Sequence, residues 1–173
     1  MKLPVCNFDA KTGILCANCE ARLRKGEITE ADVMASKIMV GLANGGPEFD
    51  RFTLKRASKV DGSFLLELEE SDMTSLRANH DLRERLEGAF GGQVWAVAAD
   101  GDDRRFLEDV LFPAKILTVN TVWLPDGRKR TKVIVPAKRS ERKLGEFGKL
   151  RDAVWQARRI ELLVETERED RLR

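Results

Sequence analysis

Apolar residues recur with a helical spacing from residue 31 onward, which predicts the first long helix. Thr29 and Asp32 have the spacing of a capping box, in which the two side chains accept each other's backbone N–H groups. The apolar positions after Thr29 predict one buried face, formed by Ala31, Met34, Ala35, Ile38 and Leu42. The segment Asn44-Gly45-Gly46-Pro47 is expected to end this helix.

From about residue 50, a pattern of elements occurs twice. The first copy is predicted as strand, hairpin turn, strand, helix and strand over 52–60, 61–62, 64–68, 73–90 and 94–98. Residues 64–68 alternate in polarity as strands do, and the glycine of Asp61-Gly62 tolerates the positive φ of a hairpin turn. The second copy is predicted as helix, strand, turn, strand, two helices that meet at a glycine pair, and strand. The second copy's bounds are 104–111, 116–123, 126–127, 132–135, 149–158 for the last helix and 160–164.

These repeated elements predict an α+β fold with two tandem units. If the helix that begins at Thr29 belongs to the first unit, both units share one order of elements. The expected organisation is an N-terminal cysteine-rich knuckle (1–26), a first unit (27–99), a second unit (100–165) and a charged tail (166–173). The alternative is two unrelated α+β stretches whose Asp-Gly turns coincide.

Composition is compatible with a folded core and a charged surface, since 42% of residues are hydrophobic and 35% are charged. The net charge of +2 does not indicate nucleic acid by itself, so the distribution of charge must decide. The chain has no long apolar run and no apolar stretch at its N-terminus, so we expect no membrane span and a cytoplasmic location. Three cysteines, an odd number, favour a reducing compartment over a disulfide framework.

A glycine pair lies between the last two helices of the second unit, in Gly145-Glu146-Phe147-Gly148. Glycine lets the backbone approach a phosphate chain because no Cβ stands in the way. The helix that follows would present free N–H groups and the positive end of its dipole to the phosphates. Unstacked bases could then rest on an adjoining apolar groove.

This order of elements, with the segment 144–164, resembles the type II KH arrangement, and the two adjacent units are similar to those of the NusA-like transcription factors of archaea. The resemblance covers roughly residues 28–165 and rests on element order more than on identity. It implies binding of single-stranded RNA on nascent transcripts, with RNA polymerase or another transcription protein as partner, in elongation, termination or antitermination. The loop departs from the family, which usually has a basic residue where this chain has Glu146 and Phe147.

Basic residues flank the glycine pair on both sides. Residues 128–151 contain ten basic residues and only two acids, Glu141 and Glu146, and such density attracts polyanions. The predicted RNA-binding residues are Lys138, Arg139, Arg142, Lys143, Gly145, Glu146, Phe147, Gly148, Lys149 and Arg151. A solvated charged face is the alternative interpretation. In the first unit the corresponding loop, 77–80, has no glycine and lies among acidic residues, so we expect a scaffold or a protein contact there.

The cysteines form two short pairs, Cys6-Asn7-Phe8-Asp9 and Cys16-Ala17-Asn18-Cys19. Two such pairs on turns can surround a tetrahedral zinc ion, which accepts thiolate and carboxylate ligands. We therefore predict a structural Zn²⁺ site of Cys6, Asp9, Cys16 and Cys19. The alternatives are a redox CxxC, which favours a βαβ context that this segment lacks, and unused thiols.

The remaining residues indicate no enzyme. No nucleophile–base pair, Walker loop or dinucleotide fingerprint is present. His80, the only histidine, is expected at the surface, and Trp95, Trp123 and Trp155 are expected in the core. The sequence thus favours a single-stranded RNA-binding protein. The alternatives are a protein-interaction adaptor and a ribosome-assembly factor that uses the same basic face.

Overall fold

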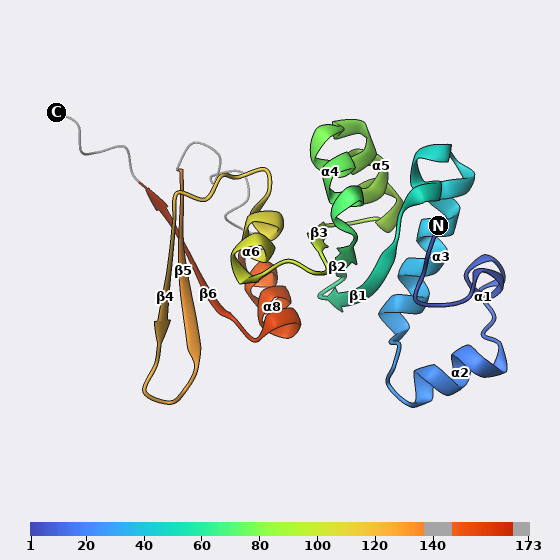
Figure 1. The fold of residues 1–173 in the computed structure, drawn as a ribbon, viewed down its shortest axis with the longest axis horizontal. Coiled ribbons are helices and arrows are strands. Elements are labelled where there is room, and N and C mark those ends of the chain that lie inside the picture. The colour runs from blue at the N-terminus through green and yellow to red at the C-terminus, as the bar shows by residue number, and fades with distance from the viewer. Residues whose placement is uncertain (137–146, 168–173) are drawn as a thin grey trace. The chain divides into compact units, whose positions relative to one another are not determined.

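The computed structural model describes residues 1–136 and 147–167 of the chain. These residues form an α+β protein with two three-stranded sheets (Figure 1). Backbone contacts divide the chain into two units, Met1–Asp100 and Gly101–Arg173. In the described part, no helix is long and apolar enough to cross a membrane.

The first unit begins with three helices, α1 (Asn7–Thr12), α2 (Ala17–Arg24) and α3 (Glu30–Asn44). No periodicity had predicted α1 and α2, because helices of six and eight residues are too short to show one. The capping box of Thr29 and Asp32 opens α3, as predicted.

The buried face of α3 differs in part from the predicted face. Ala35, Met39, Val40 and Leu42 are buried, whereas Met34 is 43% exposed. The sequence pattern predicted that Met34 is buried, because its spacing from Ala31 and Ile38 puts it near the apolar face of the helix. The core-facing surface is instead centred nearer Met39.

The rest of the first unit is a sheet with two helices. Its elements are η1 (Pro47–Arg51), β1 (Leu54–Val60), β2 (Ser63–Leu68), α4 (Glu70–Ala78), α5 (His80–Phe90) and β3 (Val94–Ala98). β2 lies in the centre, antiparallel to β1 and parallel to β3. Asp61 and Gly62, with φ of 48° and 77°, form the predicted hairpin turn between β1 and β2. The predicted alternation of burial along β2 is wrong, because five of its six residues are buried in this central strand.

A single apolar core joins the sheet to α3, α4 and α5. The rings of Phe64 on β2 and Phe90 on α5 meet in this core, with their centroids 5.0 Å apart. The helix predicted over 73–90 is in fact two helices that meet at Asn79, where α4 ends and α5 begins.

The second unit repeats this topology. Its described elements are α6 (Asp103–Leu111), β4 (Thr118–Trp123), β5 (Lys129–Pro136), α8 (Phe147–Arg158) and β6 (Glu161–Glu167). β5 lies in the centre, antiparallel to β4 and parallel to β6. Asp126-Gly127 lies in the hairpin connection of β4 and β5, as predicted. The two sheets therefore share strand order and strand directions, as the repeated sequence pattern predicts.

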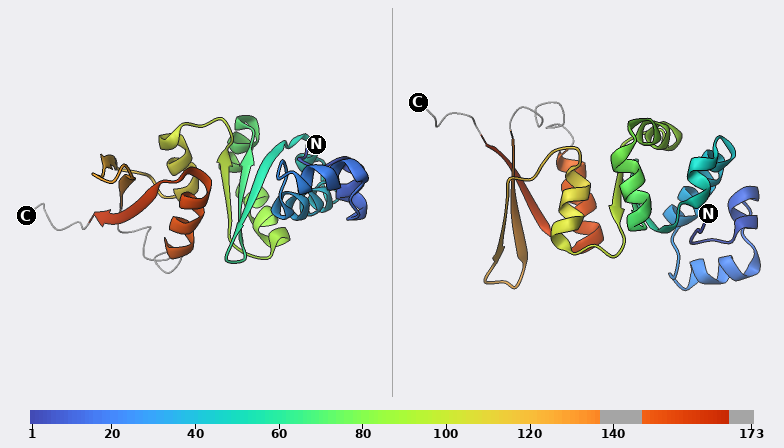
Figure 2. Two further views of the ribbon diagram at one scale, coloured as in Figure 1. Left: turned by 90° about the horizontal axis from the view of Figure 1, so that it is seen from below. Right: turned by 45° about the horizontal axis from the view of Figure 1, so that its top comes forward.

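In the second unit, α6 and α8 lie side by side on one face of the sheet (Figures 1 and 2). Alternate residues of β5, Val133 and Val135, are buried on this face, and α8 buries Leu150 and Val154. β6 continues to Glu167, three residues beyond its predicted end, because it pairs with β5 as far as Pro136. Part of the expected charged tail is therefore strand.

Candidate metal centre and candidate nucleic-acid interface

The two cysteine-containing motifs occupy equivalent places on α1 and α2. Cys6 and Cys16 are the N-cap residues of the two helices. Asp9 and Cys19 are each the third helical residue, so both motifs direct an N-cap side chain and a first-turn side chain to the same side. One ligand atom from each of the four residues lies within 4.8 Å of the others.

Asp9 provides a test of whether these residues fit a cation. Its side chain is buried, and its Oδ2 accepts the Cys16 backbone N–H at 3.1 Å. Its Oδ1 is buried without a hydrogen-bond partner among the described residues. A buried carboxylate oxygen without a partner destabilises the fold, and a cation coordinated by that oxygen would remove the cost. The donor set of three sulfurs and one carboxylate fits a metal ion such as zinc.

The buried side chains of this cluster influence each other's protonation. The neighbouring Cys19 thiol, ahead of smaller influences from Cys16 and Cys6, lowers the pKa of Asp9 to about 2. Burial, followed by the Asp9 carboxylate, raises the pKa of Cys19 to about 12. A bound cation would release this thiol proton, since metals bind the thiolate.

Buried apolar residues of the first unit pack beside the cluster of Cys6, Asp9, Cys16 and Cys19. Cys19 belongs to a buried apolar group with Val5, Ala10, Ile28 and Val40. Arg22 on α2 donates to the Pro4 carbonyl oxygen at 2.8 Å and fixes the N-terminal segment beside the helices. The N-terminal knuckle is thus packed against α3 as part of the first unit.

The structure describes only some of the predicted RNA-binding residues. Lys138, Arg139, Arg142, Lys143, Gly145 and Glu146 lie outside the described residues. Phe147 is the first residue of α8, so the second half of the glycine motif opens this helix. Gly148, Lys149 and Arg151 are exposed at its beginning. A Cβ added at Gly148 would meet no atom of the described residues within 4 Å.

The basic residues of the segment 128–151 differ in whether an acidic side chain pairs with them. On the β4–β5 hairpin and β5, the cations pair with acids from outside the run: Arg128 with Asp126, Lys129 with Asp103, Arg130 with Glu161 and Lys132 with Glu165. The sequence count therefore overstated the positive charge of this part. By contrast, no ion pair within the described ranges involves Lys149 or Arg151, and the first turn of α8 contains no acid.

In the first unit, the equivalent helix start is already occupied. The Asn79 side-chain oxygen accepts the backbone N–H groups of Asp81 and Leu82, at 3.0 and 3.3 Å. Arg83 donates to the carbonyl oxygens of Leu76 and Arg77 and closes the end of α4. With these donors used internally and Asp81 in its first turn, α5 offers little to a phosphate. His80 is exposed, as expected.

Two of the three tryptophans are exposed to solvent. Trp95 is buried, but Trp123 is 69% exposed and Trp155 is 40% exposed, so the expectation of three core tryptophans is wrong. Trp123 ends β4 at the edge of its sheet, directly before the Leu124-Pro125 turn. Its place next to a turn was the available signal that helices would not cover it.

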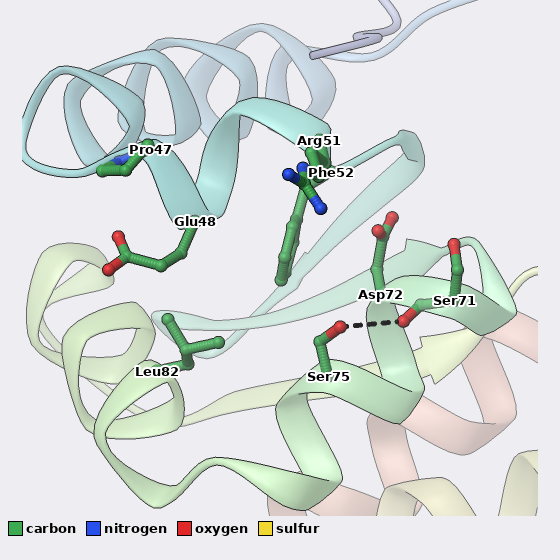
Figure 3. A pocket seen from close by; sticks show the side chains of 8 residues that line it. All are labelled: Pro47, Glu48, Arg51, Phe52, Ser71, Asp72, Ser75 and Leu82. Atoms are coloured by element: carbon green, nitrogen blue, oxygen red, sulfur yellow. Dashed lines mark hydrogen bonds between the residues drawn. The ribbon is translucent and has the colours of Figure 1, made fainter.

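A cavity of about 540 Å³ lies between η1 and the start of α4 in the first unit (Figure 3). Its wall includes Asp72, whose Oδ2 accepts the Thr53 N–H at 2.7 Å, and Ser75, whose hydroxyl donates to the Ser71 carbonyl oxygen at 3.1 Å. Burial raises the pKa of Asp72. These polar groups stabilise the local backbone, and the described wall pairs no nucleophile with a base.

Comparison with known proteins does not assign a function to this chain. No known protein family matches the chain, and no curated protein matches it. Among solved structures, the chain is similar to the crystal structure of APE1850, with 16% sequence identity, a TM-score of 0.49 and coverage of 76% of this chain and 96% of that chain. A likeness at this level carries no argument about function.

Proposed function

We propose that the chain is a single-stranded RNA-binding protein with two KH-type units, of which the second binds RNA. One observation carries this proposal: α8 opens within the glycine motif, with Lys149 and Arg151 exposed and no acid in its first turn. Helix starts normally favour acidic side chains, because the dipole there is positive. A helix start with cations instead is suited to an external anion such as a phosphate.

The topology supports the KH-type part of the proposal. Each sheet has a central strand with one antiparallel and one parallel neighbour, in the element order that the resemblance to type II KH units implies. By the same resemblance, the protein would act NusA-like on nascent transcripts, with RNA polymerase or another transcription protein. The first unit, whose helix start is capped by Asn79, would serve as scaffold.

RNA retention by loop variants tests the proposal. Replacing Glu146 and Phe147 with Asp-Asp puts carboxylates where phosphates would approach, and should weaken binding of a short single-stranded RNA strongly. The matched change of Ala78 and Asn79 to Asp-Asp in the first unit should have little effect, since Asp also serves as an N-cap. Equal losses, or no salt-dependent retention by the wild type, would contradict RNA binding by the second unit and favour a protein-interaction adaptor.

We further propose that the metal centre holds a structural Zn²⁺ ion. The buried, unpartnered Oδ1 of Asp9 beside three thiols supports it, and four protein ligands would complete the tetrahedral coordination of a structural zinc site. Purified protein should contain about one zinc per chain. Metal-free protein with three freely titrating thiols and an unchanged unfolding transition would contradict this assignment.

A further inference from the structure

The outer edge of β4 is unlike the other sheet edges of the protein. Residues 116–125 contain no charged side chain, in a chain that is 35% charged. β4 pairs only with β5 among the described strands, so no strand of the described residues pairs with its outer backbone edge. Of its side chains, Val122 is 55% exposed and Trp123 is 69% exposed. An edge strand presents unpaired N–H and C=O groups that can pair with another strand, and charged side chains normally protect against this.

The other edge strands have the protection that β4 lacks. β1, the equivalent edge of the first unit, contains Lys55, Arg56 and Lys59. Its beginning is also covered by the N-terminal segment, since Lys2 pairs with Thr53. β6, the opposite edge of the same sheet, contains three glutamates. β3 is uncharged but short, and four of its five residues are buried.

The backbone of β4 is oriented for pairing. Leu124 N–H bonds to the Arg128 carbonyl oxygen at 2.8 Å, and backbone groups alternate in direction along an antiparallel strand. Asn120 and Val122 therefore face β5, while Val119, Thr121 and Trp123 direct their N–H and C=O groups to the free edge. These three outward positions are uncharged.

We propose that β4 pairs antiparallel with β4 of a second copy of this chain, which joins the two sheets into one of six strands. A second copy of β4 is a suitable partner because β4 has no charged side chain. When a strand pairs with its own copy, any charged residue lies opposite or near the same charge, and this repulsion destabilises the pair. A register centred on Thr121 sets Thr121 opposite its own copy and Trp123 opposite Val119 of the other chain. This aromatic–β-branched pair covers the exposed Trp123 ring.

The pairing does not depend on RNA binding, because it uses the β4 edge and none of the residues at the start of α8. Sedimentation of the full chain without RNA is therefore an independent test. Wild-type protein should show a concentration-dependent monomer–dimer equilibrium. Thr121→Pro should shift it toward monomer, because proline removes an outward N–H without breaking the bonds to β5.

Trp123→Lys provides a second variant that leaves the backbone intact. It removes the aromatic pair and places a charge at the edge, so the dimer dissociation constant should rise by about tenfold or more. Leu163→Lys, which places the same charge at an exposed position of β6, is the matched control and should leave the equilibrium unchanged. A wild type that is monomeric at every soluble concentration, or a dimer unaffected by Trp123→Lys, would overturn the proposal. Circular dichroism identifies any variant that fails to fold. If Thr121→Pro fails to fold, the result for Trp123→Lys decides the test.

Discussion

Asp9 and Cys19 hold the same position in two successive helices, the third residue after an N-capping cysteine, and both are buried. The metal centre is therefore built from two copies of one local arrangement. In the first copy a carboxylate stands where the second has a thiol. This equivalence makes Asp9 the residue at which the ligand set can be changed with the least disturbance of the backbone.

Substitutions at Asp9 should separate a ligand from a merely buried acid. Asp9→Cys completes a four-thiolate set and should keep or increase zinc affinity, since zinc binds thiolates well. Asp9→Ala leaves three ligands and should weaken zinc binding by about tenfold or more, which corresponds to about 1.4 kcal/mol. Competition with a chromophoric chelator measures both. Equal affinities of Asp9→Ala and the wild type would remove Asp9 from the ligand set.

The charge division of the second unit predicts which cations affect RNA binding. Replacing Lys149 and Arg151 with alanine should reduce the salt slope of single-stranded RNA affinity by about 0.7 for each phosphate that is no longer neutralised. Lys129 and Lys132 are the matched control, because each already pairs with an acid. Their replacement removes the same formal charge from the same unit and should change the slope little. Equal effects of both pairs would indicate a diffuse electrostatic attraction instead of a site at α8.

Local chemistry explains why much of the fold was predictable from sequence. The capping box of Thr29 and Asp32 and the turn at Asp61-Gly62 depend on neighbouring residues alone, and both were confirmed. The cysteine cluster was also predictable, because its ligands lie within one short segment. The break at Asn79 was missed, since an Asn cap inside a continuous apolar pattern leaves helical periodicity almost unchanged.

The features that could not be predicted depend on residues distant in sequence. Lys129 is paired by Asp103 from α6, so a count of charges along the chain could not show that its charge is balanced. The burial of both faces of β2 does not follow from its central place in the sheet, because the equivalent strand β5 buries only alternate residues.

Asp32 connects helix α3 to the sheet and should be costly to remove. Its Oδ2 accepts the Thr29 N–H at 2.8 Å, and its Oδ1 accepts the Ala57 N–H of β1 at 2.6 Å. Asp32→Ala leaves these donors without their acceptor, at about 1–3 kcal/mol each, so we expect a loss of about 3 kcal/mol in the free energy of unfolding. Asp32→Asn keeps one acceptor oxygen and should lose less. Urea unfolding measures both, and equal stabilities of wild type and Asp32→Ala would contradict the connection.

Asp72 should make the stability of the first unit depend on pH in mildly acidic solution. Burial, with a smaller contribution from nearby Glu69, raises the pKa of Asp72 above 3.8, against the opposing Thr53 hydrogen bond and the N-terminal ammonium group. The folded protein therefore binds this proton more readily than the unfolded chain does. The resulting stabilisation is complete below pH 3.8 and is lost as pH rises through the raised pKa.

Asp72→Asn does not titrate, and its amide oxygen can still accept the Thr53 N–H in the wall of the cavity (Figure 3). The free energy of unfolding of Asp72→Asn should therefore increase relative to wild type as pH rises from about 3.8 to neutrality. Ser75→Ala, a change beside Asp72 that does not titrate, is the control and should follow the wild-type pH profile. Urea unfolding at several pH values measures the three curves. Parallel curves for wild type and Asp72→Asn would show that burial does not raise the pKa of Asp72 in the folded protein.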